Sequence, residues 1–235
     1  MRKTVFLLYI LMFALSSCDF ESDGVFTDDT TEEYQLYDYY VDEYGNEGII
    51  AYIYSSKSLS KKYVIAVSAD ETVLPWGPMG ETIYKSDTIT TNGLRSNLYG
   101  IAMHQIMKSI GIGKFPAQAW CDARNYNEDY PRAGSWHLPS YYEYQLIFGS
   151  KGTNVNTLNS ALSSIGGTPF SNNMYWTCSE DYDNYITIND VESDYDPMNR
   201  AVITSPFIAT HSYKDRWLKK NKYNVRAVKY VYYHD

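Results

Sequence analysis

The hydrophobic periodicity of this chain changes twice along its length, and this change constrains the fold most. Residues 63–67 form a compact run of β-branched and aromatic residues, which is typical of a buried strand. Apolar residues then recur at three- and four-residue spacing over 98–110, the period of an amphipathic helix. Residues 225–233 alternate with period two, as a strand does. The order of strands, helices and strands predicts a single α+β domain.

The strands at the two ends of this domain are expected to meet. A turn signal at residues 45–48 separates residues 37–44 from residues 49–54 and predicts a hairpin. Further strands are predicted at 174–177, 185–188 and 201–208. We expect one antiparallel sheet in which the N-terminal and C-terminal strands are adjacent, with the helices supplied by the middle of the chain.

Start and stop residues predict three more helices. Pro116 suits the first position of one of them. Ser140 and Glu143 have the spacing of a capping box for a helix that runs to Phe148. A last helix is predicted over residues 158–165, because glycines and a proline follow it.

The N-terminal segment is typical of an exported lipoprotein. A basic start is followed by an apolar run that is too short to span a bilayer comfortably. The run ends Leu15-Ser16-Ser17-Cys18, which resembles the bacterial lipobox, in which the cysteine becomes lipidated. An ordinary signal peptide with an incidental cysteine is the alternative. We therefore predict a signal peptide over 1–17, a lipidated acidic tether over 18–35 and a folded domain over 36–235.

The residues of the acidic tether indicate in which membrane the lipoprotein is anchored. Multiple acyl chains on Cys18 give stable anchoring, so the membrane is an expected partner. Acids and small polar residues follow the cysteine, as in the export signals of some surface lipoproteins. Asp19, directly after the cysteine, retains lipoproteins at the inner membrane in some bacteria. We expect an outer-membrane lipoprotein exposed at the cell surface.

Composition excludes one class of partner and suggests another. The formal charge is −8 without a long basic run, so nucleic-acid binding is not expected. The chain contains 25 tyrosines, and tyrosine supplies rigid, amphipathic contact area. The alternative is that tyrosines only cover strand surfaces and loops. The tyrosines proposed for contact with a glycan or a surface protein are Tyr141, Tyr142, Tyr182, Tyr185 and Tyr195.

Five segments, in order, resemble one known family. They contain an Ala-rich turn with Cys121, a Trp-x-Leu-Pro-Ser segment before a helix, a helix with a stop, a Tyr-Trp-Thr-Cys-Ser-Glu strand and a closing Val-Arg-Ala-Val. The segments are residues 119–123, 135–146, 158–169, 175–180 and 225–228. This set is similar to the Lcl C-terminal-like domain family of bacterial surface proteins, whose function is unknown. The resemblance implies a C-type-lectin-like fold.

The same segments contain residues with a structural interpretation. Trp136, Leu138 and Trp176 are expected in the core, and His137 is expected to be a structural histidine. Arg226 lies between valine and alanine, so it either pairs with an interior acid such as Glu180 or stays on the surface.

Cysteines and acids leave two chemical alternatives open. An exported compartment permits a disulfide between Cys121 and Cys178, and two buried thiols are the alternative. Acids crowd residues 180–196, and calcium takes hard oxygen ligands. The calcium candidates are Asp190, Glu192, Asp194 and Asp196, with a solvated acidic loop as the default. No other cofactor is expected.

The sequence shows no nucleotide-binding glycine loop, nucleophile elbow or histidine pair at metal-ligand spacing. We therefore expect a non-enzymatic recognition domain that binds a glycan or a surface protein in adhesion. A structural subunit of an envelope or fimbrial complex is the alternative, and an enzyme is the least favoured hypothesis.

Overall fold

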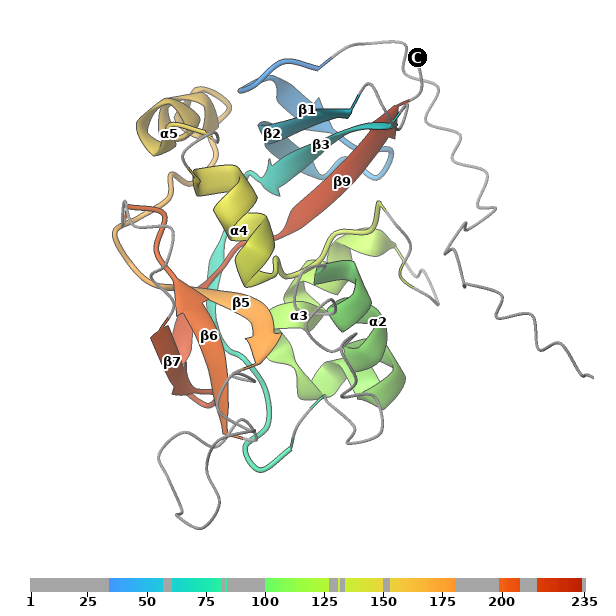
Figure 1. The fold of residues 1–235 in the computed structure, drawn as a ribbon, viewed down its shortest axis with the longest axis vertical. Helices are drawn as coiled ribbons and strands as arrows, with labels where there is room; N and C mark the ends of the chain where they lie inside the picture. Colours follow the sequence, from blue (N-terminus) through green and yellow to red (C-terminus); the bar gives the residue numbers. More distant parts are fainter. Residues whose placement is uncertain are drawn as a thin grey trace, which may run out of the picture.

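The computed structural model describes residues 34–56, 61–81, 83, 100–126, 131, 134–149, 153–180, 199–207 and 215–233. In these residues the fold is α+β, with helices from the middle of the chain and two sheets (Figure 1). Of the helices in these ranges, none is long and apolar enough to cross a membrane.

The first sheet joins the two ends of the folded chain. Its strand order is β1-β2-β3-β9, and every neighbouring pair is antiparallel. The strands are β1 (Tyr39–Val41), β2 (Glu47–Ser56), β3 (Lys61–Ser68) and β9 (Val228–Tyr233). The predicted hairpin and the adjacency of the first and last strands are therefore confirmed.

A second sheet corrects the expectation of one sheet. Its order is β4-β8-β5-β6-β7, and only β5 and β8 run parallel. The strands are β4 (Thr72–Pro75), β5 (Tyr175–Glu180), β6 (Arg200–Thr204), β7 (Asp215–Leu218) and β8 (Lys222–Val225). Strands β4 and β7 were not predicted, nor was β8 apart from its last residue, and the strand predicted at 185–188 lies outside the described residues.

The continuous strand predicted over residues 225–233 is wrong in one respect. The chain leaves the second sheet after Val225 and enters the first sheet at Val228. Between them, the buried Arg226 guanidinium donates to the carbonyl oxygens of Ser68 at 2.7 Å and Thr168 at 2.6 Å. These bonds orient the Arg226 side chain toward the turn after β3. The chain therefore changes sheets within the segment whose alternation predicted a single strand.

The predicted helices are all present. They are α2 (Gly100–Gly111), α3 (Pro116–Asp122), α4 (Tyr141–Phe148) and α5 (Val155–Ser164), with short 3-10 turns at Ile112–Lys114 and Ala123–Asn125. Helix α4 has the predicted capping box, which typically contributes about 1 kcal/mol. Helix α5 starts earlier than predicted, because the side chain of Asn154 caps it.

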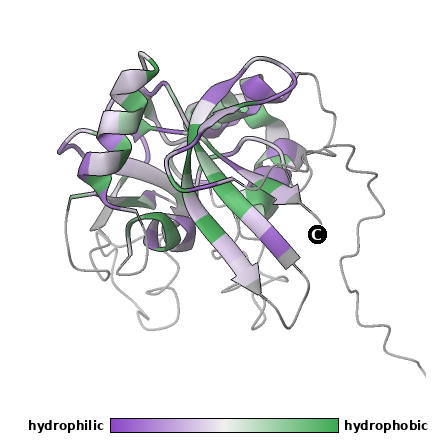
Figure 2. Cartoon of the chain, turned by 90° about the horizontal axis from the view of Figure 1, so that it is seen from above, coloured by the Kyte–Doolittle hydropathy of each residue, from purple (hydrophilic) through white to green (hydrophobic). Residues whose placement is uncertain are grey.

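Helix α4 lies between the two sheets and contacts β2, β5 and β6 (Figure 1). One hydrophobic cluster contains Trp76, Trp136, Leu138 and Trp176, all of them buried. The other packs α4 and α5 against the first sheet. Figure 2 shows strands that mix hydrophobic green bands with pale residues of intermediate hydropathy. The core positions predicted for Trp136, Leu138 and Trp176 are confirmed.

Candidate functional site

Six tyrosines gather on one face of the first sheet, beside helix α4. Within a strand, residues two apart share a face, and the register places Tyr54 opposite Tyr63 and Tyr63 opposite Tyr232. The next row pairs Tyr52 and Tyr230 with Ile65 between them. We call this set the tyrosine face: Tyr52, Tyr54, Tyr63, Tyr142, Tyr230 and Tyr232.

The rings of the tyrosine face touch one another across three strands. The Tyr54 and Tyr63 rings stack with centroids 4.7 Å apart, and Tyr63 meets Tyr230 edge to face at 5.2 Å. Tyr232 lies 5.9 Å from Tyr63 and 6.1 Å from Tyr230. Such aromatic pairs add about 0.5–1.5 kcal/mol each beyond the area that they bury. The rings therefore support one another across β2, β3 and β9.

Most of the tyrosine face is partly covered, because Tyr52, Tyr63 and Tyr232 pack against the second hydrophobic cluster. Tyr142 is 38% exposed, Tyr52, Tyr54, Tyr63 and Tyr232 are half-buried, and Tyr230 is buried. Burial raises the pKa of Tyr52 and of Tyr63, and neighbouring tyrosines, including Tyr142, raise both further. These hydroxyls are therefore neutral over the physiological pH range.

A buried carboxylate lies at the inner end of the tyrosine face. The hydroxyl of Tyr230 donates to Glu143 Oε1 at 2.8 Å, and the backbone N–H groups of Ser140 and Gly100 donate to the same carboxylate at 2.7 and 2.9 Å. His137 Nε2 lies 3.3 Å from both carboxylate oxygens, and its ring stacks on Tyr230 with centroids 5.8 Å apart. Glu143 and His137 are fully buried.

This network fixes the charge of Glu143. Burial alone would raise the pKa of the carboxyl group, but His137 and the N–H groups of Ser140 and Gly100 outweigh burial and lower it. For Tyr230, burial and then Glu143 raise the pKa. An ionised carboxylate with a neutral phenol bound to it is a structural anchor, and it positions Tyr230 within the face.

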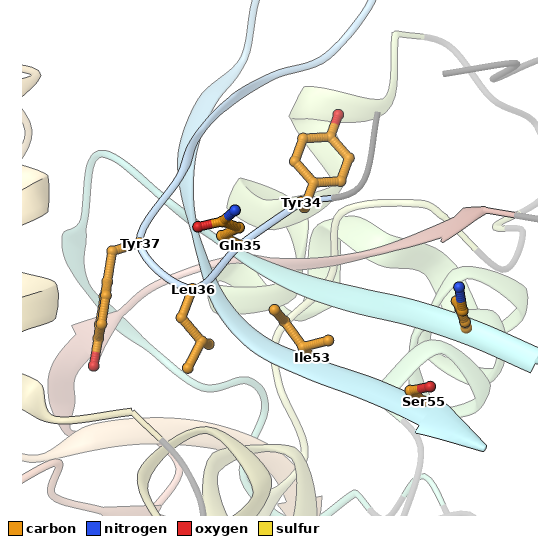
Figure 3. Close-up of a pocket in the computed structure, with 7 residues that line it drawn as sticks. Tyr34, Gln35, Leu36, Tyr37, Ile53 and Ser55 are labelled. Atoms are coloured by element: carbon orange, nitrogen blue, oxygen red, sulfur yellow. The ribbon is translucent and has the colours of Figure 1, made fainter. Parts of the chain in front are cut away.

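A shallow groove of about 500 Å³ lies on the opposite side of β2. It runs between the loop at residues 34–37 and the strand, and Leu36, Ile53 and Ser55 contribute to its lining (Figure 3). Ile53 lies between Tyr52 and Tyr54 in sequence, so it points to the other face of the sheet. In Figure 3 the side chains of Tyr34 and Leu36 point in opposite directions. The groove is therefore separate from the tyrosine face.

Two of the five tyrosines proposed from the sequence lie in the described part of the chain. Tyr142 belongs to the tyrosine face, while Tyr141 is half-buried and its backbone N–H donates to Ser179 at 3.2 Å. Tyr182, Tyr185 and Tyr195 lie outside the described residues, as do Cys18 and all four calcium candidates. Lipidation, calcium binding and the contacts of these tyrosines stay predictions.

Cys121 and Cys178 are free cysteines in this structure, and both are fully buried in one hydrophobic cluster. Burial raises the pKa of the Cys121 thiol to about 12 and raises that of Cys178 well above its usual value. A disulfide between them stays a prediction for experiment. Within the described ranges, no three residues among histidine, cysteine, aspartate and glutamate come together as a metal site.

Of the two alternatives for Arg226, the interior pair with an acid is confirmed, and the acid is Glu71 instead of the example Glu180. Arg226 pairs with Glu71 at 2.7 Å, because its side chain reaches the turn after β3. Glu180 lies at the end of β5, where it forms a fully buried ion pair with Lys219. The Lys219 ammonium also lies 4.7 Å from the Trp76 ring centroid.

Sequence reasoning missed five members of the tyrosine face. Tyr52 and Tyr54, like Tyr230 and Tyr232, are spaced two apart within strands, so each pair must share a face. That spacing was visible in the sequence. The register that brings the two pairs onto one surface beside Tyr63 was not visible, because the strands are far apart along the chain.

No protein-family model and no curated protein matches this chain. Among solved structures, the fold is similar to the crystal structure of a fimbrial protein from Bacteroides ovatus, with a TM-score of 0.56 and 13% sequence identity. The match covers 83% of this chain and 48% of the fimbrial protein, so this chain spans about half of that protein's length. At this identity the likeness concerns the fold.

Proposed function

We propose that this chain is a non-enzymatic, lipid-anchored surface protein that serves as a structural subunit of a fimbrial or other envelope assembly. The observation that carries the proposal is the shared fold with a fimbrial protein over 83% of the chain. The same likeness supports a non-enzymatic role. The resemblance of five segments to the Lcl C-terminal-like family, with its implied C-type-lectin-like fold, supports a surface location independently.

The attachment that we propose is the lipid on Cys18. The lipobox sequence and the acidic residues that follow it support anchoring to the outer membrane, with the domain over residues 36–235 facing outward. A lipidated cysteine at the start of a tether would hold one end of an assembly at the membrane.

The test uses the full chain in the bacterium that produces it. We expect the protein to fractionate with the outer membrane, to be cleaved by protease added to intact cells, and to co-purify with a stoichiometric partner after mild detergent extraction. Cys18→Ala should release it from the membrane. A protein that resists external protease and elutes alone after extraction would contradict the proposal.

Recognition of a glycan or a surface protein is the second candidate function. The tyrosine face favours it, because rigid aromatic rings with polar tips are characteristic of binding surfaces. The two functions are compatible, since a subunit of a surface assembly can also hold a ligand.

A further inference from the structure

We propose that this chain binds a second copy of itself, head to tail, through two patches of opposite charge on different sheets. The inference rests on the structural role proposed above, and it names the partner and the two surfaces. One patch surrounds strand β1 and exposes acids, and the other surrounds the turn between β7 and β8 and exposes lysines. Figure 1 draws β1 in the upper part of the molecule and β7 in the lower part, so the two patches lie apart.

The first patch combines exposed apolar side chains with carboxylates. Tyr39 and Val41, at the two ends of β1, are 48% and 50% exposed. Glu47 stands opposite Val41 on the neighbouring strand and accepts a hydrogen bond from the Tyr39 hydroxyl at 2.6 Å. Glu43 and Tyr44 follow in the turn, and both are exposed. We call this set the acidic patch: Tyr39, Val41, Glu43, Tyr44 and Glu47.

The acidic patch keeps a net negative charge. Residues 34–56 contain acids at positions 38, 42, 43 and 47 and no lysine or arginine. Lys229 lies 3.6 Å from both Asp42 and Glu43, so a buried and an exposed carboxylate share one ammonium group. Glu47 is exposed and forms no ion pair with a side chain that the structure describes. A partner for this patch therefore needs cations.

Apolar exposure is concentrated at the same place. Ten large hydrophobic side chains are exposed in the described residues, and five of them lie on β1, in the turns beside it or against those turns. Tyr126 is 72% exposed and stacks on Tyr44 with centroids 5.4 Å apart. Clustered apolar groups on a surface mark protein interaction sites, and aromatic side chains are frequent anchors there. The five are Leu36, Tyr39, Val41, Tyr44 and Tyr126.

The second patch has the opposite charge. Trp217 is 42% exposed on β7, and Lys220 and Lys222 are exposed in the turn after β7 and at the start of β8. We call these three residues the basic patch. Lys219, in the same turn, is fully buried in its ion pair with Glu180 and adds no net charge. The positive charge of the patch therefore comes from Lys220 and Lys222.

The loop over residues 76–81 borders the basic patch. Its first two residues donate their backbone N–H groups to the carbonyl oxygen of Lys219, at 2.9 and 3.4 Å. The acid of this loop, Glu81, pairs with Lys114 at 3.1 Å, so it does not neutralise the patch. The loop also exposes Met79, which is 38% exposed and adds apolar surface.

Charge decides which copies of these patches can meet. Opposite charges steer two surfaces together, whereas like charges placed against each other are unfavourable. A two-fold dimer would place two acidic patches, or two basic patches, in contact. The acidic patch of one copy facing the basic patch of the next satisfies both, and each copy keeps one patch free. A contact between two different surfaces repeats into a ring or a filament, as a structural subunit requires.

The test is chemical cross-linking of the full-length protein in cells that produce it. Val41→Cys and Asn221→Cys place one thiol in each patch and retain all of its charges. With a flexible bis-maleimide, the chain that carries both substitutions should give a ladder of dimers and longer products. Each single variant should stay monomeric, because head-to-tail contact brings the two different positions together. The native thiols of Cys121 and Cys178 are buried, so they contribute little to the reaction.

Charge reversal tests whether the patches form the contact. In the chain with both cysteines, Glu43→Lys/Glu47→Lys should lower the yield of the ladder on the order of tenfold, and Lys220→Glu/Lys222→Glu should do the same. The chain with both reversals should recover the ladder, because the charges are exchanged and remain complementary.

The control adds charge elsewhere on the surface. Ser163→Lys/Ser164→Lys changes two exposed residues at the end of helix α5 and should leave the ladder unchanged. Thermal unfolding of every variant checks that the fold is intact.

Several results would overturn the inference. Dimers of the single Val41→Cys variant would mean that two β1 edges meet instead. A missing ladder, or no recovery when both patches are reversed, would exclude the contact between them. If Lys220→Glu/Lys222→Glu lowers the unfolding temperature and keeps the ladder, an acidic segment of the same chain, such as residues 181–196, is the partner of these lysines.

The proposed structural role is measured separately. A chain without a ladder that still fractionates with the outer membrane and co-purifies with a different protein would refute self-association. The role in an envelope assembly would then stand, with that protein as the neighbouring subunit.

Discussion

The first sheet carries two kinds of polar surface that meet at Tyr230. On the inner side, Glu143 accepts hydrogen bonds from two backbone N–H groups and one phenol, and it is fully buried. On the outer side, the tyrosine face turns half-buried rings toward solvent. On the inner side, Ser140 and Glu143 come from the segment at residues 135–146 described in the sequence analysis, while the tyrosine face, except for Tyr142, lies outside the five segments.

This difference shows what the segments with a family resemblance do in this chain. Trp136, Glu143 and Arg226 are all buried, and the last two bond to backbone groups from distant segments. Their pattern specifies how α4 and the two sheets are held together. The predictions below test whether the buried framework residues contribute more to stability than the exposed Tyr142 of the tyrosine face does.

The largest loss of stability is expected at Arg226. Its guanidinium holds two carbonyl oxygens and Glu71 at the point where the chain passes between the sheets. Arg226→Ala should lower the free energy of unfolding by about 3–5 kcal/mol, because it leaves these acceptors without their donor. Chemical denaturation measures the change. Lys114→Ala, at a half-exposed ion pair with Glu81, should cost under about 1 kcal/mol; equal losses would contradict the comparison.

The second effect concerns Glu143 and pH. Its pKa is lower in the folded protein than in the unfolded chain, so its contribution to stability is present at neutral pH and is lost as the pH falls through the folded pKa. We expect the free energy of unfolding to fall below about pH 4.3, the ordinary glutamate value. Glu143→Gln should cost about 1–3 kcal/mol at pH 7.

The same variant should weaken the acid dependence. Asp42 and Asp122, whose pKa values are also lowered in the fold, should retain the remainder. Denaturant titrations at pH 7 and pH 3 measure both effects. An unchanged slope with pH in Glu143→Gln would mean that this carboxylate is not the group that senses acid.

A smaller effect is expected at the core cysteines. If Cys121 and Cys178 are free thiols, Cys178→Ala removes one packed sulfur and should cost about 1 kcal/mol. If a disulfide joins them, the same change should cost about 4 kcal/mol, because the bridge closes a long loop. Alkylation of the unmodified protein without reductant, followed by mass spectrometry, decides directly. Two thiols that react only after unfolding would exclude the bridge.

The smallest effect is expected at Tyr142, the exposed member of the tyrosine face. Tyr142 is 38% exposed, so Tyr142→Ala should change stability by no more than about 0.5 kcal/mol. Tyr144, two residues later on the same helix, is buried, and Tyr144→Ala should cost about 3–5 kcal/mol. Thermal unfolding of the two variants compares the stability lost at an exposed position and at a buried position of the same helix. A large loss at Tyr142 would make the tyrosine face part of the core.

Local patterns predicted the elements well and the long-range partners poorly. Ser140 and Glu143 lie three residues apart, so the capping box of α4 could be inferred from the sequence. Arg226 and Glu71 are more than 150 residues apart, and Glu180 was an equally plausible acid until the sheets were placed. The split of residues 225–233 also escaped sequence analysis, because alternation shows that a segment is extended but not which sheet it joins.

The candidate site follows the same rule. Tyr142 could be proposed because it lies in a visible cluster at the start of a helix. Tyr54, Tyr63 and Tyr232 come together only through the pairing of β2, β3 and β9. Pairing between strands from opposite ends of a chain leaves no local signal in the sequence.

The placement of β8 and β9 has a consequence for how this protein is made. The two strands occupy residues 222–233 and complete different sheets, with β9 paired to β3 and β8 paired to both β4 and β5. A chain synthesised from its N-terminus cannot close either sheet until these last residues have emerged. Contacts of such long sequence separation also form slowly. Completion of both sheets is therefore expected to be a late and slow step of folding, because β8 and β9 pair with strands that lie far earlier in the chain.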